Sequence, residues 1–228
     1  MPSSSLARLV IGTLLLMAPL VEAADEKEAA SFSPANQLLF LDDHLTDVEY
    51  PARYHYRFSS TGTADSFNDT IVMDTHNNDD QTKQVHVEYF SGDRQRHIPD
   101  IASAKGNPII MLFLQRDVSE MSSRTGGNWR YFQKQIKLAL ENAARIEPVT
   151  LRYNGSDVAG QRITLQPFAD ERTHRNEMAA YLDKTYSFLL AEAIPGDVYE
   201  MQTTLPANDG GQPVVEHLIL DHVEPLKE

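Results

Sequence analysis

The sequence contains no cysteine, and this absence limits both how the protein is stabilised and what chemistry it performs. A chain without cysteine has no disulfide, no thiol nucleophile and no cysteine-based zinc or iron–sulfur site. It also has no N-terminal cysteine to carry a lipid anchor. We therefore expect a hydrophobic core alone to hold the fold together, which a chain of about 200 residues can supply.

Long apolar runs are scarce as well, and the one clear run lies at the start of the chain. Arg8 precedes apolar residues 9–20, and Val21-Glu22-Ala23 offers small residues at the two positions that a signal peptidase reads. About 12 apolar residues are too few for a membrane span, so the pattern predicts a signal peptide over 1–23. No later run approaches 18 residues, and the mature protein is expected to be soluble and periplasmic or secreted.

Residues 24–33 are acidic, rich in alanine and without periodicity, which is typical of a flexible leader. No linker rich in proline, glycine or serine divides the rest of the chain. We therefore expect a single domain over 34–228.

Positive charge is in short supply: 20 Lys and Arg against 33 Asp and Glu give a formal net charge of −13. With a pI near 5.0, such a surface repels phosphate, so nucleic acid and anionic lipid surfaces are unfavourable partners. The simplest role of this charge is solubility.

Motifs for catalysis and metal binding are missing too. The chain has no Gly-x-Ser-x-Gly elbow, no Ser-x-x-Lys, no glycine-rich phosphate loop and no His-Glu-x-x-His pair. The spacing Asp74-x-His76-x-Asn78-x-Asp80 lacks the central glycine and the final glutamate of a calcium loop. His217 and His222 are five apart on an expected strand and should point to opposite faces. The sequence therefore predicts no catalytic residue, no cofactor and no metal site.

The chain does contain a clear order of secondary structure. Segments 53–58, 69–74 and 83–90 have strand character, two helices follow, and the late segments 149–153, 161–165, 184–191, 197–205 and 214–222 again alternate like strands. A polar stretch over 169–181 is predicted to be a short helix. This order predicts an α+β fold: a mostly antiparallel sheet, curved in the manner of a half-barrel, with a central helix pair packed on it.

The two central helices have recognisable ends. Asn107-Pro108 is suited to start the first helix, Gly126-Gly127 to end it, and Asn128 to cap the second. In the second helix an apolar stripe should face the sheet, since its members recur every three or four residues: Trp129, Phe132, Ile136, Leu140 and Ala143.

Asp117 stands out among the acidic residues, because it shares the inward face of the first helix with Phe113 and Met121. A lone buried charge is costly, so we expect an ion-pair partner, with Arg116, Arg124 and Arg130 as candidates. A structural ion pair is the favoured interpretation, and a functional acid is the alternative.

Aromatic residues on the early strands and at the start of the second helix form the candidate binding site. If the sheet curves around the helices, they would line an apolar cleft, although they serve equally well as ordinary core. The candidate ligand-binding residues are Tyr54, Tyr56, Phe58, Tyr89, Trp129 and Phe132.

Two segments carry a resemblance: residues 106–118 (GNPIIMLFLQRDV) and 125–132 (TGGNWRYF). Together with 194–199 (IPGDVY), they resemble a family of uncharacterised exported bacterial proteins. The resemblance implies export and carries no activity. The order of strands and helices is also similar to that of periplasmic lipoprotein carriers, which is an analogy of architecture.

These observations favour an exported, non-enzymatic protein that binds an apolar ligand or an envelope protein between sheet and helices. An alternative is an envelope structural or assembly protein without a pocket, which acts through an edge strand or its surface. A hydrolase with an unfamiliar site is a third hypothesis. It would require Asp117, Glu120 or His97 to meet a second polar group in an open cleft.

Overall fold

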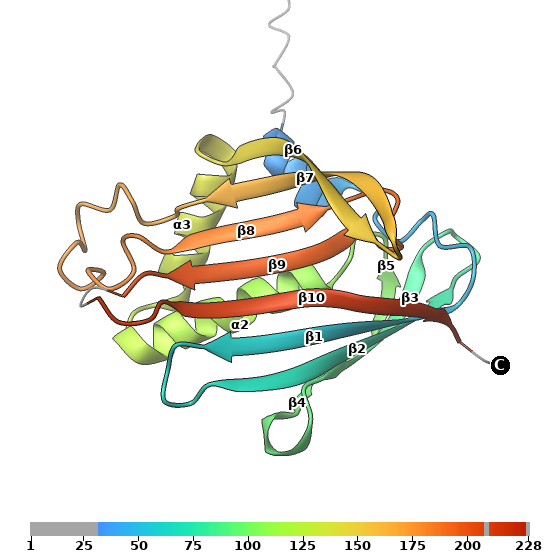
Figure 1. Cartoon of the computed structure of the whole chain (residues 1–228), viewed down its shortest axis with the longest axis horizontal. Coiled ribbons are helices and arrows are strands. Elements are labelled where there is room, and N and C mark those ends of the chain that lie inside the picture. Colours follow the sequence, from blue (N-terminus) through green and yellow to red (C-terminus); the bar gives the residue numbers. More distant parts are fainter. Residues whose placement is uncertain (1–31, 208–209, 227–228) are drawn as a thin grey trace, which may run out of the picture. The chain divides into compact units, whose positions relative to one another are not determined.

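One antiparallel sheet of ten strands dominates the fold (Figure 1). The computed structural model describes residues 32–207 and 210–226, so the predicted signal peptide and most of the predicted leader lie outside the described residues. The early strands alternate between side chains that enter the core and side chains that face away from it, most strictly in residues 83–89. The strands are β1 (Ala52–Thr61), β2 (Phe67–Asn77), β3 (Lys83–Tyr89), β4 (Arg96–His97), β5 (Ile101–Ala104), β6 (Arg145–Tyr153), β7 (Ser156–Leu165), β8 (Thr185–Leu190), β9 (Val198–Leu205) and β10 (Val214–Pro225).

The sheet joins the two ends of the described chain. Its order is β4-β3-β2-β1-β10-β9-β8-β7-β6, with β5 also paired to β3, so early β1 lies beside late β10. Within the described residues, the edge strands β4 and β6 do not pair with each other, and the sheet is not closed. The Asn154-Gly155 turn joins β6 to β7, and both residues have the positive φ that a tight hairpin turn requires.

Two helices, α2 (Ile109–Thr125) and α3 (Trp129–Asn142), pack on one face of the sheet (Figure 1). The Asn107 side chain accepts a hydrogen bond from the backbone N–H of Ile109, and Gly126 ends α2 in the left-handed conformation. Asn128 caps α3 through the N–H of Arg130, as its sequence position predicts. The predicted α+β fold with a helix pair on an antiparallel sheet is confirmed.

The expected stripe on α3 is confirmed at its centre and wrong at its ends. Phe132, Ile136 and Leu140 are buried, whereas Trp129 is 41% exposed and Ala143 is also exposed. Trp129 is the first residue of the helix and Ala143 is its C-cap, so both lie at its ends.

Other differences concern short or polar segments. The helix predicted over 169–181 is wrong: this stretch is a series of turns, because no apolar stripe drives it to pack as a helix. Strands β4 and β5, of two and four residues, and the helical turns Pro34–Asn36 and Gln37–Leu41 are too short to show a period. Among the described residues, none of the helices has the length and apolarity that a membrane span requires.

Candidate functional site

Two neighbouring cavities lie along α2 and share Phe67, Arg94, Arg116 and Glu120. We call the first, of about 370 Å³, the polar cavity, because eight of its lining residues are charged. We call the second, of about 630 Å³, the aromatic cavity, because Phe67, Tyr89 and Phe90 line it. Together they form the α2 cleft.

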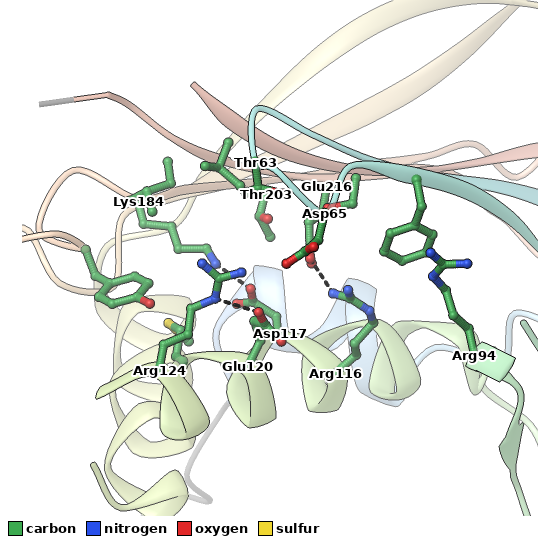
Figure 2. A pocket seen from close by; sticks show the side chains of 16 residues that line it. Thr63, Asp65, Arg94, Arg116, Asp117, Glu120, Arg124, Lys184, Thr203 and Glu216 are labelled. Atoms are coloured by element: carbon green, nitrogen blue, oxygen red, sulfur yellow. Dashed lines mark hydrogen bonds and ion pairs between the residues drawn. The ribbon is translucent and has the colours of Figure 1, made fainter. Parts of the chain in front are cut away.

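The floor of the polar cavity is a buried ion pair between Asp117 and Lys184 (Figure 2). Their side chains are 1% and 7% exposed, and Lys184 lies just before β8. The hydroxyl of Tyr186, two residues further, donates to the second carboxylate oxygen of Asp117. Burial, together with this carboxylate, raises the pKa of Tyr186 well above its ordinary value, so the phenol stays protonated and able to donate.

The partner expected for Asp117 therefore exists, but none of the three arginines considered provides it. Arg116 instead pairs with Glu216 on β10, and Arg124 pairs with Glu120 one helical turn away. The Arg116–Glu216 pair is largely buried, with side chains 20% and 10% exposed. Burial raises the pKa of Glu216, although Arg116 opposes the effect.

Three carboxylates of the polar cavity are thus neutralised by three cations (Figure 2). Among the described residues, the other two charged lining residues, Asp65 and Arg94, have no ion pair within 4.0 Å. Asp117 already accepts hydrogen bonds from Lys184 and Tyr186. Six of the eight charged side chains in this cavity are therefore held in ion pairs. No histidine is found among its described lining residues.

The aromatic cavity combines an apolar floor with cations at its side. The ring of Phe67 lies 5.5 Å from that of Phe58 and 5.6 Å from that of Phe90 between centroids. The guanidinium of Arg94 stacks over Phe67 at 4.4 Å, and that of Arg116 lies 4.9 Å from the Phe58 centroid. This arrangement places positive charge directly against apolar surface.

Tyr89 contributes an unusual feature to the aromatic cavity. It is 4% exposed, and among the described residues its buried hydroxyl finds no hydrogen-bond partner. Burial raises its pKa, so the hydroxyl remains a neutral donor. An unpaired buried hydroxyl is unfavourable unless a water molecule or a ligand satisfies it.

Arg94 and Arg96 are exposed, and within the described part of the chain neither forms an ion pair within 4.0 Å. Arg116 is neutralised by Glu216, and Glu120 by Arg124. The aromatic cavity therefore has a local excess of two positive charges in a chain whose formal charge is −13. Such a local excess attracts anions.

The six predicted ligand-binding residues are dispersed. Tyr54, Tyr56, Phe58 and Phe132 are buried core residues, each at most 2% exposed, and the Tyr56 hydroxyl accepts a hydrogen bond from Asn107 at 3.2 Å. Tyr89 lines the aromatic cavity, while Trp129 lines a separate surface hollow. The binding role of the set stays a prediction.

Of the three residues considered for a hydrolase, two lie in one cavity and the third lies elsewhere. Asp117 and Glu120 line the polar cavity, where each is held by a cation, whereas His97 lies exposed on β4 opposite Glu88.

Sequence reasoning missed the cationic side of the α2 cleft. The run Arg94-Gln95-Arg96 is basic, but nothing in the local sequence places it beside Phe67 and Arg116. Lys184, just before β8, and Glu216, on β10, reach the site from positions far along the chain.

A third cavity, of about 570 Å³, is acidic. Burial and the nearby carboxylates of Asp47, Glu192 and Asp42 raise the pKa of Asp197 to about 7.

No protein-family model matches the chain, and no curated protein matches it. The fold is distantly similar to that of MucB, which is known from Pseudomonas aeruginosa and was crystallised with MucA(peri); the TM-score is 0.39 and the identity 10%, over 81% of this chain and 54% of MucB. LprF from Mycobacterium bovis matches with a TM-score of 0.34 and 11% identity, over 86% of this chain and 97% of LprF. An outer membrane lipoprotein-sorting protein domain from Vibrio parahaemolyticus matches with a TM-score of 0.25 and 9% identity. The match covers 78% of this chain and 88% of that domain.

The chain spans about half the length of MucB. These likenesses concern architecture and give no family assignment. The analogy with lipoprotein carriers and the resemblance of residues 106–118, 125–132 and 194–199 to an exported family both stay predictions.

Proposed function

We propose that this protein is an exported, non-enzymatic binding protein whose aromatic cavity takes an amphiphile with an anionic group. The observation that carries the proposal is the pairing of an aromatic floor with two arginines that form no ion pair in the described chain. A cavity of about 630 Å³ lies within the range of sites for small organic ligands.

Each part of the cavity has a role in this proposal. The apolar part of the ligand lies against Phe67, Phe90 and Leu112, where burial of its surface drives binding. Arg94 and Arg96 hold the anionic group, since arginine donates in a forked geometry to carboxylates and phosphates.

The test is a fluorescence titration with 11-(dansylamino)undecanoic acid, followed by competition with an anionic lysophospholipid or with a neutral monoacylglycerol. We expect saturable binding and displacement by both competitors, with the anionic one about tenfold stronger, because one charge-assisted contact contributes on the order of 1.4 kcal/mol. Arg94→Ala with Arg96→Ala should remove that advantage and leave the neutral competitor unchanged.

Two further variants sharpen the test. Leu112→Trp fills the aromatic cavity and should abolish binding of the probe and both competitors. Arg152→Ala, which removes an exposed arginine that lines neither cavity, should change nothing. Absence of saturable binding, or an equal effect of Arg152→Ala, would refute the proposal. Native mass spectrometry of protein from its host then identifies the natural ligand by mass.

Strand β6 favours a second candidate function, the envelope assembly protein. It is a nine-residue edge strand, and among the described residues no strand pairs with its outer side, which leaves that side open to a partner strand. Pro148 within it is consistent with an edge position. The test is capture of a partner protein from periplasmic extract. If the partner still binds the Arg94→Ala and Arg96→Ala variant but no longer binds Thr150→Lys, this function is favoured over ligand binding.

A further inference from the structure

A β-bulge in β10 changes the direction of a histidine. Residues 216, 218 and 220 of β10 are buried on the core face, so strict alternation would also place residue 222 there. The pairing of β1 with β10 shifts by one residue, however: His55 lies opposite His222, and Tyr56 lies opposite Leu220. The extra residue, Asp221, lets both Asp221 and His222 face outward.

The bulge brings three metal-ligating side chains together on the outer face of the sheet. One ligand atom from each of His55, His222 and Glu224 lies within 4.8 Å of the others. The two imidazoles stack with their centroids 4.2 Å apart and their planes 14° apart, and His55 Nε2 lies 3.3 Å from a Glu224 carboxylate oxygen. We propose that His55, His222 and Glu224 form a surface site for one divalent transition-metal ion of the Cu²⁺ and Zn²⁺ class.

The neighbouring side chains support a metal-ligating role for His222. Its Nδ1 lies 2.9 Å from an Asp221 carboxylate oxygen, and Asp221 is itself held by Arg57 at 2.8 Å. When Nδ1–H donates to this carboxylate, Nε2 carries the free lone pair. A carboxylate behind a ligating histidine is the usual support of a metal site, because it fixes the tautomer and raises ligand basicity.

The local charge also permits a cation. Among the described residues, the charged side chains paired with or opposite the three ligands are Asp221, Arg57 and Arg53, besides Glu224 itself; Arg57 is neutralised by Asp221 and Arg53 by Asp74. Glu224 is then the uncompensated charge that faces the ion.

The geometry requires only a small adjustment. Tetrahedral bonds of about 2.1 Å separate ligand atoms by about 3.4 Å, so atoms that lie up to 4.8 Å apart must approach one another by at most about 1.4 Å. The side chains of His55, His222 and Glu224 are 30%, 51% and 53% exposed, which leaves room for this movement. Two nitrogens and one oxygen suit Cu²⁺ and Zn²⁺, whereas Ca²⁺ and Mg²⁺ prefer oxygen ligands. Water completes the coordination.

The test is a calorimetric titration of tag-free full-length mature protein with CuCl₂ and, separately, with ZnCl₂. We expect one equivalent of tight binding, no binding of Ca²⁺ at the same concentration, and a Cu²⁺ electron paramagnetic resonance spectrum with coupling to two nitrogens. His55→Ala and His222→Ala should each weaken binding at least tenfold. Asp221→Asn should weaken it about tenfold through the orientation of His222.

The matched control is His86→Ala. His86 is another exposed strand histidine paired to a carboxylate, with Nδ1 2.7 Å from Asp100, but among the described residues it belongs to no three-ligand cluster. The proposal is overturned if wild-type protein binds no equivalent more tightly than about 100 µM, which is about −5.5 kcal/mol. It is equally overturned if His86→Ala weakens binding as much as His222→Ala does, or if the spectrum shows fewer than two nitrogens. The spectrum of the wild-type protein keeps the test valid even if a variant fails to fold.

Discussion

Breaking the buried Asp117–Lys184 ion pair on one side should strongly destabilise the protein, and Asp117→Asn tests this. The substitution removes the charge from a side chain that is 1% exposed and leaves the Lys184 ammonium, 7% exposed, without its counter-ion. The asparagine oxygen can accept from Lys184 or from Tyr186, but its NH₂ group then faces the other donor. Removing one partner of a buried pair costs about 3–5 kcal/mol.

The expected change is well within reach of urea denaturation followed by circular dichroism and by the fluorescence of Trp129, the single tryptophan. For a domain of this size each kcal/mol lowers the melting temperature by about 2–4 °C, so the loss should be on the order of 10 °C. The matched control on the same helix is Glu120→Gln, which breaks an exposed pair with Arg124 and should cost at most about 0.5 kcal/mol.

A double-mutant cycle separates the ion pair from simple loss of packing. Asp117→Asn combined with Lys184→Met removes both charges. The double variant should lose less stability than the sum of the losses of the two single variants, by about 2 kcal/mol or more. If Asp117→Asn unfolds within 0.5 kcal/mol of wild type, or if the two losses simply add, then the reasoning about this buried pair is wrong.

Two other predictions concern the pH dependence of stability and a strained turn. The pKa of Asp197 is raised from 3.8 to about 7 in the folded state, so native protein binds more protons than unfolded protein between those values and stability should fall as pH rises through them. Asparagine tolerates the positive φ of 60° at this position, so Asp197→Asn keeps the turn. The variant should be more stable than wild type by on the order of 1 kcal/mol at pH 8, and equally stable at pH 4. Equal stability of the two proteins at pH 8 in thermal melts would contradict this prediction. Gly62→Ala should cost about 2 kcal/mol or more in urea denaturation, because φ is +83° and the new Cβ would lie 2.1 Å from the Pro213 carbonyl oxygen; an unchanged midpoint would disprove the clash.

The sequence predicted the fold well where a period runs for several residues. Strands such as β3, with strict alternation of buried and exposed side chains, and the capped helix α3 follow from local pattern alone. Segment 169–181 failed because polar residues provide no stripe, and its turns are fixed by contacts such as that of Glu171 with the Tyr131 hydroxyl. Local reasoning cannot supply such contacts.

The candidate site was predictable only in part. The helical period placed Asp117 on the buried face of α2, and the cost of burying a lone carboxylate correctly required a partner. Three nearby arginines were considered, yet the partner is Lys184, 67 residues away. Its position follows from β8 pairing between β7 and β9, which depends on the order of strands in the whole sheet.

The cluster around His222 shows why a single inserted residue matters more than the composition of a strand. Period-two reasoning placed His217 and His222 on opposite faces, and this is wrong because Asp221 occupies a bulge that restores His222 to the outer face. Nothing in the spacing of the histidines reveals the bulge, since it arises from the register of β10 against β1. His55, at the other end of the sequence, enters the same cluster through that register. A ligand set of this kind is therefore a property of strand pairing, and it becomes visible only when the two strands are aligned residue by residue.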